Sequence, residues 1–309
     1  MIEAKKIKKG DKVALVGTSG AISKDRLREG IEFVKKLGLE PIVGESCNGE
    51  YGYLSGSDQL RASDLNKFFS DETISGIFCM RGGYGAPRIL DLIDYEVVKR
   101  NPKIFIGYSD ITALHLAFNQ KSNLITYHSP MPSTEFYKIV DEYTLKSFLN
   151  NIMERENFLE NEKLIENPEE QKLITLVHGK AQGELIGGNL TLIASLMGTP
   201  YEIDTKGKIL FLEDIDEEPY RIDRMLTQLR LAGKFQEAAG IILGAFTNCE
   251  AKNPERSLSL EEVIADTVLS SGKPVIKNLA AGHCLPTMTL PLGKIVNIDT
   301  KCGSLEIIN

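Results

Sequence analysis

The chain is predicted to be an α/β protein in which an N-terminal parallel-sheet domain is followed by a mixed α/β domain with more β character. Two observations predict this class. Over the first half of the chain, short apolar runs that suit buried strands alternate with amphipathic helical segments, and glycine-rich turns follow the runs. Strands that alternate with helices pair in parallel through right-handed crossovers, so the loops at their carboxyl ends gather at the sheet edge where ligands usually bind.

The N-terminal elements follow from these patterns in order. Leu27, Ile31, Val34 and Leu37 are spaced by three and four residues, which predicts one apolar face of a helix over 24–37. The other elements expected in this half are strands over 13–16, 40–43, 74–80 and 104–106, and helices over 89–98 and 111–118.

The second half begins after a polar, acidic stretch. The sequence predicts an N-terminal α/β domain over 1–155, a linker over 156–172 and a C-terminal mixed domain over 173–309. The C-terminal domain is expected to contain strands over 173–178, 180–186, 208–212, 241–246, 294–299 and 304–308, and helices over 189–197, 220–232 and 260–269.

Composition excludes several classes of protein. With 42% hydrophobic and 26% charged residues among 309, the chain is expected to be globular. Its net charge of −7 and the lack of a basic block disfavour a nucleic-acid partner. Its five cysteines include no C-x-x-C pair, which argues against a disulfide framework and a zinc ribbon. No segment approaches the ~20 apolar residues of a membrane span, and no signal peptide is evident, so a cytoplasmic protein is expected.

Residues 104–110, Ile-Phe-Ile-Gly-Tyr-Ser-Asp, carry the first candidate for chemistry. A strand that turns sharply into a helix can present a nucleophilic hydroxyl, here that of Ser109, beside helix amides that hold an anion. Ser109 or Asp110 could instead be an ordinary helix N-cap. The usual nucleophile turn also has glycine two residues after the serine, where this chain has Ile111.

A glycine loop follows the strand over 74–80 and reads Arg81-Gly82-Gly83-Tyr84-Gly85. Closely spaced glycines free backbone N–H groups to point at a phosphate or at an oxyanion. The loop lacks the ending of a P-loop and the spacing of a dinucleotide fingerprint. An anion-binding loop and a plain tight turn both remain open.

A serine nucleophile needs a base, and the chain has four histidines. His115 lies more than one helical turn after Ser109 and is not expected to reach it. His128 and His178 lie in or near strands, where packed roles are as plausible. His283, on a loop between Gly282 and Pro286, is the best-placed base. Cys284 beside it is rejected as a cysteine nucleophile, because adjacent side chains tend to point apart.

Glu213 is the candidate acid, because it ends an apolar strand where a carboxylate can orient an imidazole. The acidic residues 213–218 could alternatively bind a divalent cation or cap the helix over 220–232. Helix capping would account for Asp216 to Glu218 but does not explain Glu213. Since no histidine lies at metal-ligand spacing from Glu213, no metal site is expected.

Six motifs together resemble one family over nearly the whole chain. In order they are Arg81-Gly82-Gly83-Tyr84-Gly85-Ala86, Gly107-Tyr108-Ser109-Asp110, Gly187-Gly188-Asn189-Leu190, Leu212-Glu213-Asp214-Ile215 with Pro219, Gly282-His283, and Thr289-Leu290-Pro291-Leu292-Gly293. This series resembles the LD-carboxypeptidases, serine peptidases that also include the microcin C self-immunity peptidase.

The resemblance implies an active site between two α/β domains and a Ser-His-Glu triad. Ser109 matches the nucleophile, His283 the base and Glu213 the orienting acid. The backbone amides of Gly83 and Asp110 match the oxyanion hole. Tyr108 and Cys284, next to catalytic positions, depart from relatives without putting a role in doubt.

The resemblance also implies a substrate: a cytoplasmic murein tetrapeptide, cleaved before its terminal D-alanine during peptidoglycan recycling. Asn189 matches a pocket residue, and Tyr84 is expected to contact the substrate. Arg81 is a candidate for the terminal carboxylate because of its place in the glycine loop. No cofactor is expected, and a homodimer is implied.

Two other functions remain open. One is a microcin C-type immunity peptidase, whose relatives stack the adenine on aromatic residues that include a tryptophan; this chain has no tryptophan. The other is a non-catalytic protein that binds an anion or nucleotide through the glycine loop.

Overall fold

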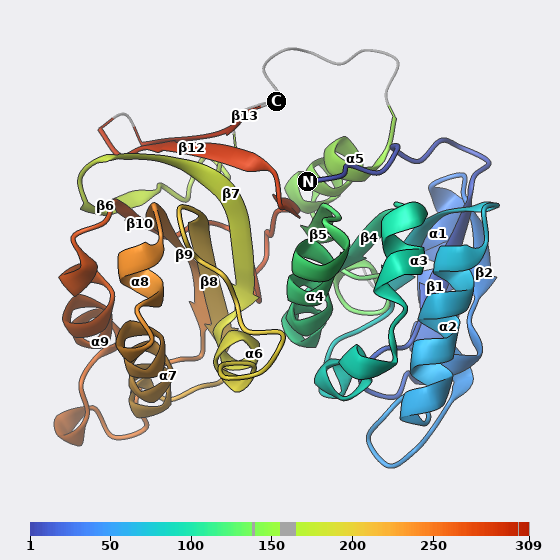
Figure 1. The fold of residues 1–309 in the computed structure, drawn as a ribbon, viewed down its shortest axis with the longest axis horizontal. Coiled ribbons are helices and arrows are strands. Elements are labelled where there is room, and N and C mark those ends of the chain that lie inside the picture. Colours follow the sequence, from blue (N-terminus) through green and yellow to red (C-terminus); the bar gives the residue numbers. More distant parts are fainter. Residues whose placement is uncertain (138–139, 155–164, 302, 309) are drawn as a thin grey trace. The chain divides into compact units, whose positions relative to one another are not determined.

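The computed structural model of the chain describes residues 1–137, 140–154, 165–301 and 303–308 (Figure 1). Part of the expected linker, up to residue 164, lies outside the described residues. The chain divides into two compact units. Unit 1 comprises Met1–Asn157 and Met288–Leu292, and unit 2 comprises Phe158–Thr287 and Gly293–Asn309. The predicted α/β class is confirmed, with a mostly parallel sheet in unit 1.

Unit 1 is built on a six-stranded sheet in the order β11-β5-β4-β3-β1-β2. Its strands are β1 (Lys12–Val16), β2 (Glu40–Val43), β3 (Ile74–Cys79), β4 (Ile104–Gly107), β5 (Thr126–His128) and β11 (Leu290–Leu292). Strands β1 to β5 pair in parallel, and β11 pairs antiparallel with β5. The carboxyl ends of the parallel strands therefore lie at the same end of the sheet. The loops after β1, β3 and β4 all begin there.

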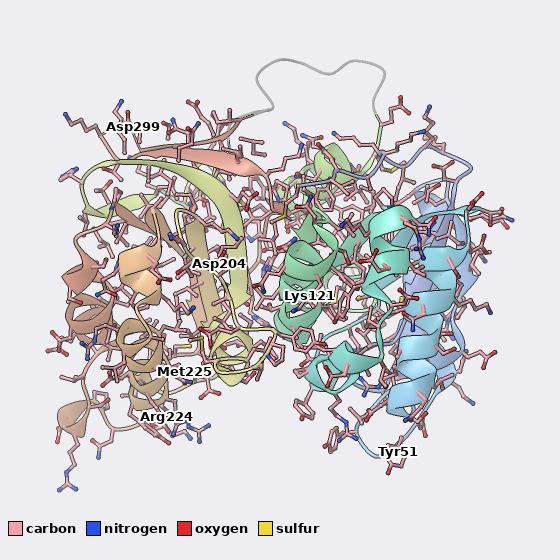
Figure 2. The ribbon with its side chains drawn as sticks, in the orientation of Figure 1. Tyr51, Lys121, Asp204, Arg224, Met225 and Asp299 are labelled. Atoms are coloured by element: carbon pink, nitrogen blue, oxygen red, sulfur yellow. The ribbon has the colours of Figure 1, made fainter. Side chains whose placement is uncertain are left out.

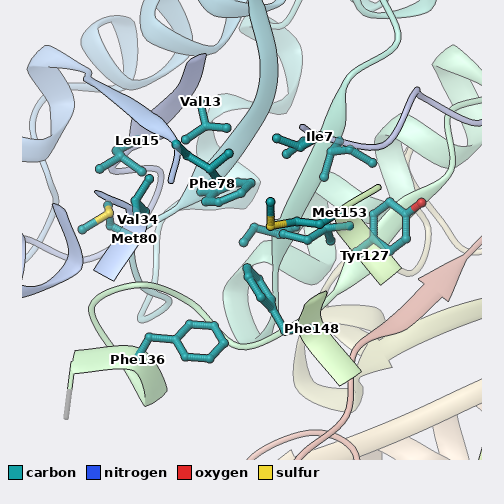
Figure 3. Packing of buried hydrophobic residues seen from close by; sticks show 14 of the residues in the cluster. Ile7, Val13, Leu15, Val34, Phe78, Met80, Tyr127, Phe136, Phe148 and Met153 are labelled. Carbon is teal, nitrogen blue, oxygen red and sulfur yellow. The ribbon is translucent and has the colours of Figure 1, made fainter. Parts of the chain in front are cut away.

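Helices cover both faces of this sheet (Figure 1). They are α1 (Lys24–Lys36), α2 (Asp58–Ser70), α3 (Tyr95–Arg100), α4 (Thr112–Ser122) and α5 (Glu142–Ile152). On one face, α1 and α5 join alternate strand residues in a buried cluster that includes Val13, Phe78 and Phe148 (Figure 3). On the other, Phe105 of β4 packs against Phe118 of α4 with ring centroids 4.9 Å apart. Both faces are apolar, as a parallel sheet requires.

Strand β11 is a C-terminal segment within the sheet of unit 1. Leu290 pairs with His128 and Leu292 with Thr126, so β11 enters at the edge where the parallel strands end. The sequence predicts all of 173–309 in one C-terminal domain, whereas Met288–Leu292 belongs to unit 1. Pro291 suits this strand at the end of the sheet order, because proline has no backbone N–H to donate to a neighbouring strand.

Two local expectations need correction, and some elements were not expected at all. The helix expected over 89–98 is a 3₁₀ helix, Ala86–Leu92, followed by α3; Ile93 between them is extended, and the Asp94 side chain caps α3. Helix α2 was not expected, because charged residues that it buries weaken its amphipathic pattern. The strand predicted over 180–186 continues to Asn189.

Unit 2 is a seven-stranded mixed sheet in the order β13-β12-β7-β8-β9-β10-β6. Its strands are β6 (Ile174–Val177), β7 (Lys180–Asn189), β8 (Ile209–Ile215), β9 (Gly240–Thr247), β10 (Val275–Lys277), β12 (Ile295–Asp299) and β13 (Ser304–Ile308). Its helices are α6 (Leu190–Ser195), α7 (Pro219–Leu231), α8 (Lys234–Glu237) and α9 (Leu260–Thr267). Strands β7 to β10 are parallel, and Thr191 of α6 contacts the sulfur of Met225 in α7, labelled in Figure 2.

Across the described ranges, no helix combines the length and apolar character that crossing a bilayer requires. Four cysteines, Cys47, Cys79, Cys249 and Cys284, carry free thiols, and Cys302 lies outside the described residues.

Candidate active site

Ser109 lies in a sharp turn between β4 and α4. Its φ is 63°, a left-handed conformation that is uncommon for residues other than glycine. Tyr108 before it is extended, and a short 3₁₀ helix, Ser109–Ile111, leads into α4. Strained backbone of this kind clusters at functional sites and is typical of a strand-to-helix turn that presents a nucleophile.

The helix-capping interpretation of this turn is wrong. The residues at the N-cap positions of the 3₁₀ helix and of α4 are Tyr108 and Ile111, and neither makes a side-chain capping bond. The carboxyl group of Asp110 is bound to other loops, as described below. Ser109 therefore owes its place in this turn to something other than helix initiation.

Ile111 occupies the position that is glycine in the usual nucleophile turn, and Gly107 explains how it fits. A Cβ atom on Gly107 would lie 2.9 Å from the Cγ atoms of Ile111, too close for any larger residue. Ile111 is fully buried in the space that this glycine leaves. The turn thus keeps glycine two residues before the serine, at Gly107. Two residues after the serine it has the apolar side chain of Ile111.

His115 supports the turn from within α4. The ring reaches back to the carbonyl of Gly107, with Nε2 2.8 Å from the oxygen. Burial lowers the pKa of His115 to about 4, so the ring is neutral at neutral pH and Nε2–H is the donor. The expectation that His115 does not act as the base agrees with this structural role.

The glycine loop lies directly beside Ser109. A Cβ atom on Gly82 would lie 3.1 Å from Oγ of Ser109, so only glycine allows this approach without displacement. Gly83 has a φ of 122° and Gly85 a φ of 138°, conformations that favour glycine. The loop therefore brings backbone close to the serine hydroxyl, which an oxyanion hole requires.

Arg81 and Tyr84 flank the loop. The guanidinium of Arg81 donates to the carbonyls of Ala21 (3.0 Å) and Gly82 (3.2 Å), and it is half-buried. Burial, with the charge of Arg26, lowers the pKa of Arg81 from its usual high value. Tyr84 is 50% exposed, and its ring centroid lies 5.9 Å from that of exposed Tyr53. Tyr51, in the same loop as Tyr53, is exposed as well (Figure 2).

Unit 2 pairs the predicted acid with the predicted base. Nδ1 of His283 lies 2.7 Å from Oε2 of Glu213, and the same oxygen accepts a hydrogen bond of 3.2 Å from the His283 amide. Glu213 is fully buried. An ionised carboxylate only accepts, so Nδ1 carries the hydrogen and Nε2 is the basic nitrogen. This is the arrangement in which a carboxylate orients a catalytic imidazole.

Backbone features bring this pair together. The pairing of β8 with β9 shifts register between Leu212 and Asp214, and irregularities of this kind re-aim side chains next to active sites. On the other side, Gly282 has a φ of 107°, and a Cβ atom there would lie 2.6 Å from Oε2 of Glu213. The loop can rest on the carboxylate only because residue 282 is glycine.

Both the oxygen and the nitrogen of the Asn189 side-chain amide form hydrogen bonds within unit 2. Its oxygen caps α6 by accepting from the Leu192 amide, and its amide nitrogen donates to Asp214 at 3.0 Å. Asp214 also accepts from both the backbone and the hydroxyl of Thr191. Burial raises the pKa of Asp214, and these donors oppose that change. Asn189 thus joins α6 to β8 next to Glu213, and its contact with substrate remains a prediction.

The acidic residues after Glu213 do not cap α7 as expected. Glu218 occupies the N-cap position without a side-chain capping bond, and its carboxylate lies 3.4 Å from Lys252. Glu217 pairs with Arg221, and Asp216 accepts from Asn248. Among the described residues, no cluster of histidine, cysteine, aspartate or glutamate could hold a metal ion.

Two buried side chains near the glycine loop were not predicted from the sequence: Arg61 of α2 and Ser19 of the loop after β1. A charged residue in a helix is usually read as solvent-facing, so Arg61 gave no signal. The run Gly17-Thr18-Ser19-Gly20 was noted only as the end of a strand. Its place after a parallel strand was the available signal.

Comparison with solved structures shows the class of protein to which this fold belongs. The microcin C7 self-immunity protein MccF in complex with aspartyl sulfamoyl adenosine superposes with a TM-score of 0.87 at 26% identity, over 99% of this chain and 98% of that one. Muramoyltetrapeptide carboxypeptidase from Oxalobacter formigenes gives a TM-score of 0.81 at 25% identity, over 96% and 97%. The class is that of two-domain carboxypeptidases and their immunity relatives.

Sequence comparison defines the family. The LD-carboxypeptidase N-terminal domain matches residues 13–129, and the LD-carboxypeptidase C-terminal domain matches residues 182–298. A probable murein peptide carboxypeptidase from Bacillus subtilis is 42% identical over 96% of this chain and 91% of its own length. The microcin C7 self-immunity protein MccF of Escherichia coli is 28% identical over 96% and 93%. The chain belongs to the LD-carboxypeptidase family of peptidases.

Proposed function

We propose that the protein is a serine carboxypeptidase that cleaves the L,D peptide bond before the terminal D-alanine of murein tetrapeptides, through a triad of Ser109, His283 and Glu213. The family and the 42% identical relative named for murein peptides support this reaction. Cleavage would serve peptidoglycan recycling in the cytoplasm, and the predicted homodimer stays part of the proposal.

The observation that carries the proposal is the hydrogen bond between His283 and the buried Glu213 in unit 2, to which unit 1 adds the left-handed turn of Ser109 beside the glycine loop. Met288–Leu292 belongs to unit 1, and β11 enters the sheet at the edge where Ser109 follows β4. There, Oγ of Ser129 lies 3.0 Å from Oγ1 of Thr289, and the Ser129 amide donates to Gly107, two residues before the serine. The chain that follows His283 thus continues into the unit 1 sheet that carries Ser109.

The proposed reaction follows from the chemistry of these groups. Nε2 of His283 takes the proton of Ser109 as Oγ attacks the scissile carbonyl, and Glu213 stabilises the imidazolium. The amides of Gly83 and Asp110 hold the oxyanion of the tetrahedral intermediate; one such donor contributes on the order of 3 kcal/mol to lowering the barrier. His283 then protonates the amine of D-alanine, which leaves. Water deprotonated by His283 hydrolyses the acyl-enzyme and releases the tripeptide.

The substrate assignment is tested with two tetrapeptides that differ only in the configuration of the last alanine. The expected result is a tripeptide, detected by mass, from the D-alanine form and none from the L-alanine form. Release from the L-alanine form alone would refute the L,D assignment. Absence of hydrolysis of both forms would favour the non-catalytic alternative, in which the glycine loop binds an anion.

A second candidate function is hydrolysis of an aminoacyl nucleotide of the microcin C type, which the TM-score of 0.87 to MccF favours. The absence of tryptophan from this chain and the higher identity to the murein-peptide relative favour the first candidate. Aspartyl sulfamoyl adenosine, offered in the same assay, separates the two: its cleavage without release of D-alanine would select the second.

Arg81 is proposed to bind the terminal carboxylate of the substrate. In Arg81→Ala we expect KM for the tetrapeptide to rise about 10- to 100-fold, the effect of losing a charge-assisted hydrogen bond. The matched measurement uses the same tetrapeptide with a C-terminal amide. The wild type should prefer the free acid, and Arg81→Ala should lose this preference. An unchanged KM, or a preference that survives the substitution, would contradict the assignment.

A further inference from the structure

We propose that the side chains of Asp110 and Ser19 are positioning residues, which hold the glycine loop against the turn of Ser109 and so preorganise the oxyanion hole. This inference rests on the proposed function and adds to it. The backbone amide of Asp110 already has a proposed role, whereas its carboxyl group and the loop after β1 have had none.

The carboxyl group of Asp110 joins three loops at the carboxyl edge of the unit 1 sheet. Its Oδ2 atom accepts from the hydroxyl of Ser19 at 2.5 Å, in the loop after β1. The same oxygen accepts from the amide of Ala86 at 2.7 Å, directly after the glycine loop that follows β3. Asp110 itself belongs to the turn after β4. One oxygen thus fixes the distances between the turn of Ser109 and both neighbouring loops.

Both side chains are withdrawn from solvent. Asp110 and Ser19 are fully buried, so neither is available to contact substrate as a surface group. Burial raises the pKa of Asp110, while the bonds from Ser19 and Ala86 oppose that rise. Burying a carboxyl group costs free energy unless the group is hydrogen-bonded. The hydrogen bonds from Ser19 and Ala86 therefore favour this one arrangement of the loops.

Arg61 holds the same two loops from the other side. Its guanidinium donates to the carbonyl of Gly85 at 2.8 Å and to the carbonyl of Thr18, next to Ser19. Arg61 is fully buried, and it also pairs with Asp58. A Cβ atom on Gly85 would lie 2.8 Å from its Nη1, so the loop rests directly on the guanidinium.

The orientation of the Gly83 amide follows from these contacts. The Gly20 amide, one residue after Ser19, donates to the carbonyl of Gly82 at 3.3 Å. In a trans peptide the C=O and the following N–H point in opposite directions. The N–H of Gly83 therefore points away from the loop after β1. If the hydrogen bond between Ser19 and Asp110 is lost, the loop after β1, which sets this orientation, is no longer attached to the turn of Ser109.

The test compares Ser19→Ala, Asp110→Ala and Asp110→Asn. For the two alanine variants we expect kcat for D-alanine release to fall about 10- to 100-fold at unchanged KM, because misplacement near 1 Å costs about this much. Asp110→Asn keeps one acceptor oxygen for Ser19 and Ala86 and should recover most of the activity. Active sites are counted by stoichiometric labelling, so that loss of folded protein does not count as loss of rate.

A second readout separates positioning from general stability. A tripeptidyl boronic acid, which forms a tetrahedral adduct with a serine hydroxyl, should bind Ser19→Ala and Asp110→Ala more weakly by the same factor as kcat, whereas affinity for the product tripeptide stays unchanged. Ser57→Ala, which removes the N-cap of α2, is the matched control: it should lower Tm without changing kcat.

The outcomes distinguish this inference from the proposed function. If the wild type releases D-alanine and both alanine variants match it in kcat and boronate affinity, the positioning role is refuted. If both variants lose boronate and product affinity equally, the effect is on ground-state binding, which also overturns the inference. If the wild type releases no D-alanine, the proposed function itself fails.

Discussion

Replacing Ser109 by alanine is expected to lower kcat/KM for D-alanine release by at least about 10⁴-fold, because removal of a triad nucleophile leaves only the contribution of the oxyanion hole and binding. The substrate should still bind, since the glycine loop and Arg81 are untouched. The measurements are the rate of tripeptide formation by mass spectrometry and the Kd of the tetrapeptide by calorimetry.

Ser122→Ala is the control for this prediction. Ser122 ends α4 in the same unit, is buried like many serines of this domain, and donates to the carbonyl of Tyr95. It should keep wild-type activity per folded molecule. Activity of Ser109→Ala above about a hundredth of wild type would remove Ser109 from the nucleophile's role and leave the glycine loop as a binding site.

The second large effect is expected at Glu213. In Glu213→Gln the side-chain shape is kept, but the amide carries no charge to stabilise the imidazolium, and its NH2 group can donate to Nδ1 and so select the other tautomer. We expect kcat to fall about 10³- to 10⁴-fold, as when the orienting carboxylate of a triad becomes an amide. Glu217→Gln, four residues along the same segment, should leave kcat unchanged.

A double variant tests whether Glu213 acts through His283. Residues that act as a unit are not additive, so Glu213→Gln should reduce activity no further in a His283→Ala background. Additive losses in the double variant would show that Glu213 affects the reaction without the imidazole. Circular dichroism of each variant establishes that the buried site still folds.

Local patterns predicted β1 to β4, α1 and α4 of unit 1, because nearby residues determine these elements, whereas α2, α5 and β5 were not predicted. The apolar spacing over 24–37 corresponds to α1, and the run 104–106 lies within β4. Strand β11 was not predictable in the same way. Its pairing of Leu290 with His128 joins distant parts of the chain, and nothing local to a three-residue strand indicates its partner.

The same difference between local and distant contacts applies to the candidate site. The closely spaced glycines of the loop indicated where backbone must approach closely, and the structure places Gly82 beside Ser109. Gly282, which lies against Glu213, gave no such indication from the sequence. The hydrogen bond between His283 and Glu213 joins a loop to a distant strand. Local sequence marked each residue as a candidate, and the family resemblance implied that they act together. The contacts of Asp110, Ser19 and Arg61 were missed, because periodicity gives no sign that a polar side chain is buried and paired.

The most direct measurement of the central claim is the rate at which a fluorophosphonate labels Ser109 in the wild type and in His283→Ala. A hydroxyl reacts fast only when a base removes its proton, so the rate reports whether a histidine of unit 2 activates a serine of unit 1. The account predicts stoichiometric labelling of the wild type, mapped to Ser109 by peptide mass, and labelling slowed by at least about 10³-fold in His283→Ala. Equal labelling rates in the two proteins, or modification of a different residue, would contradict it.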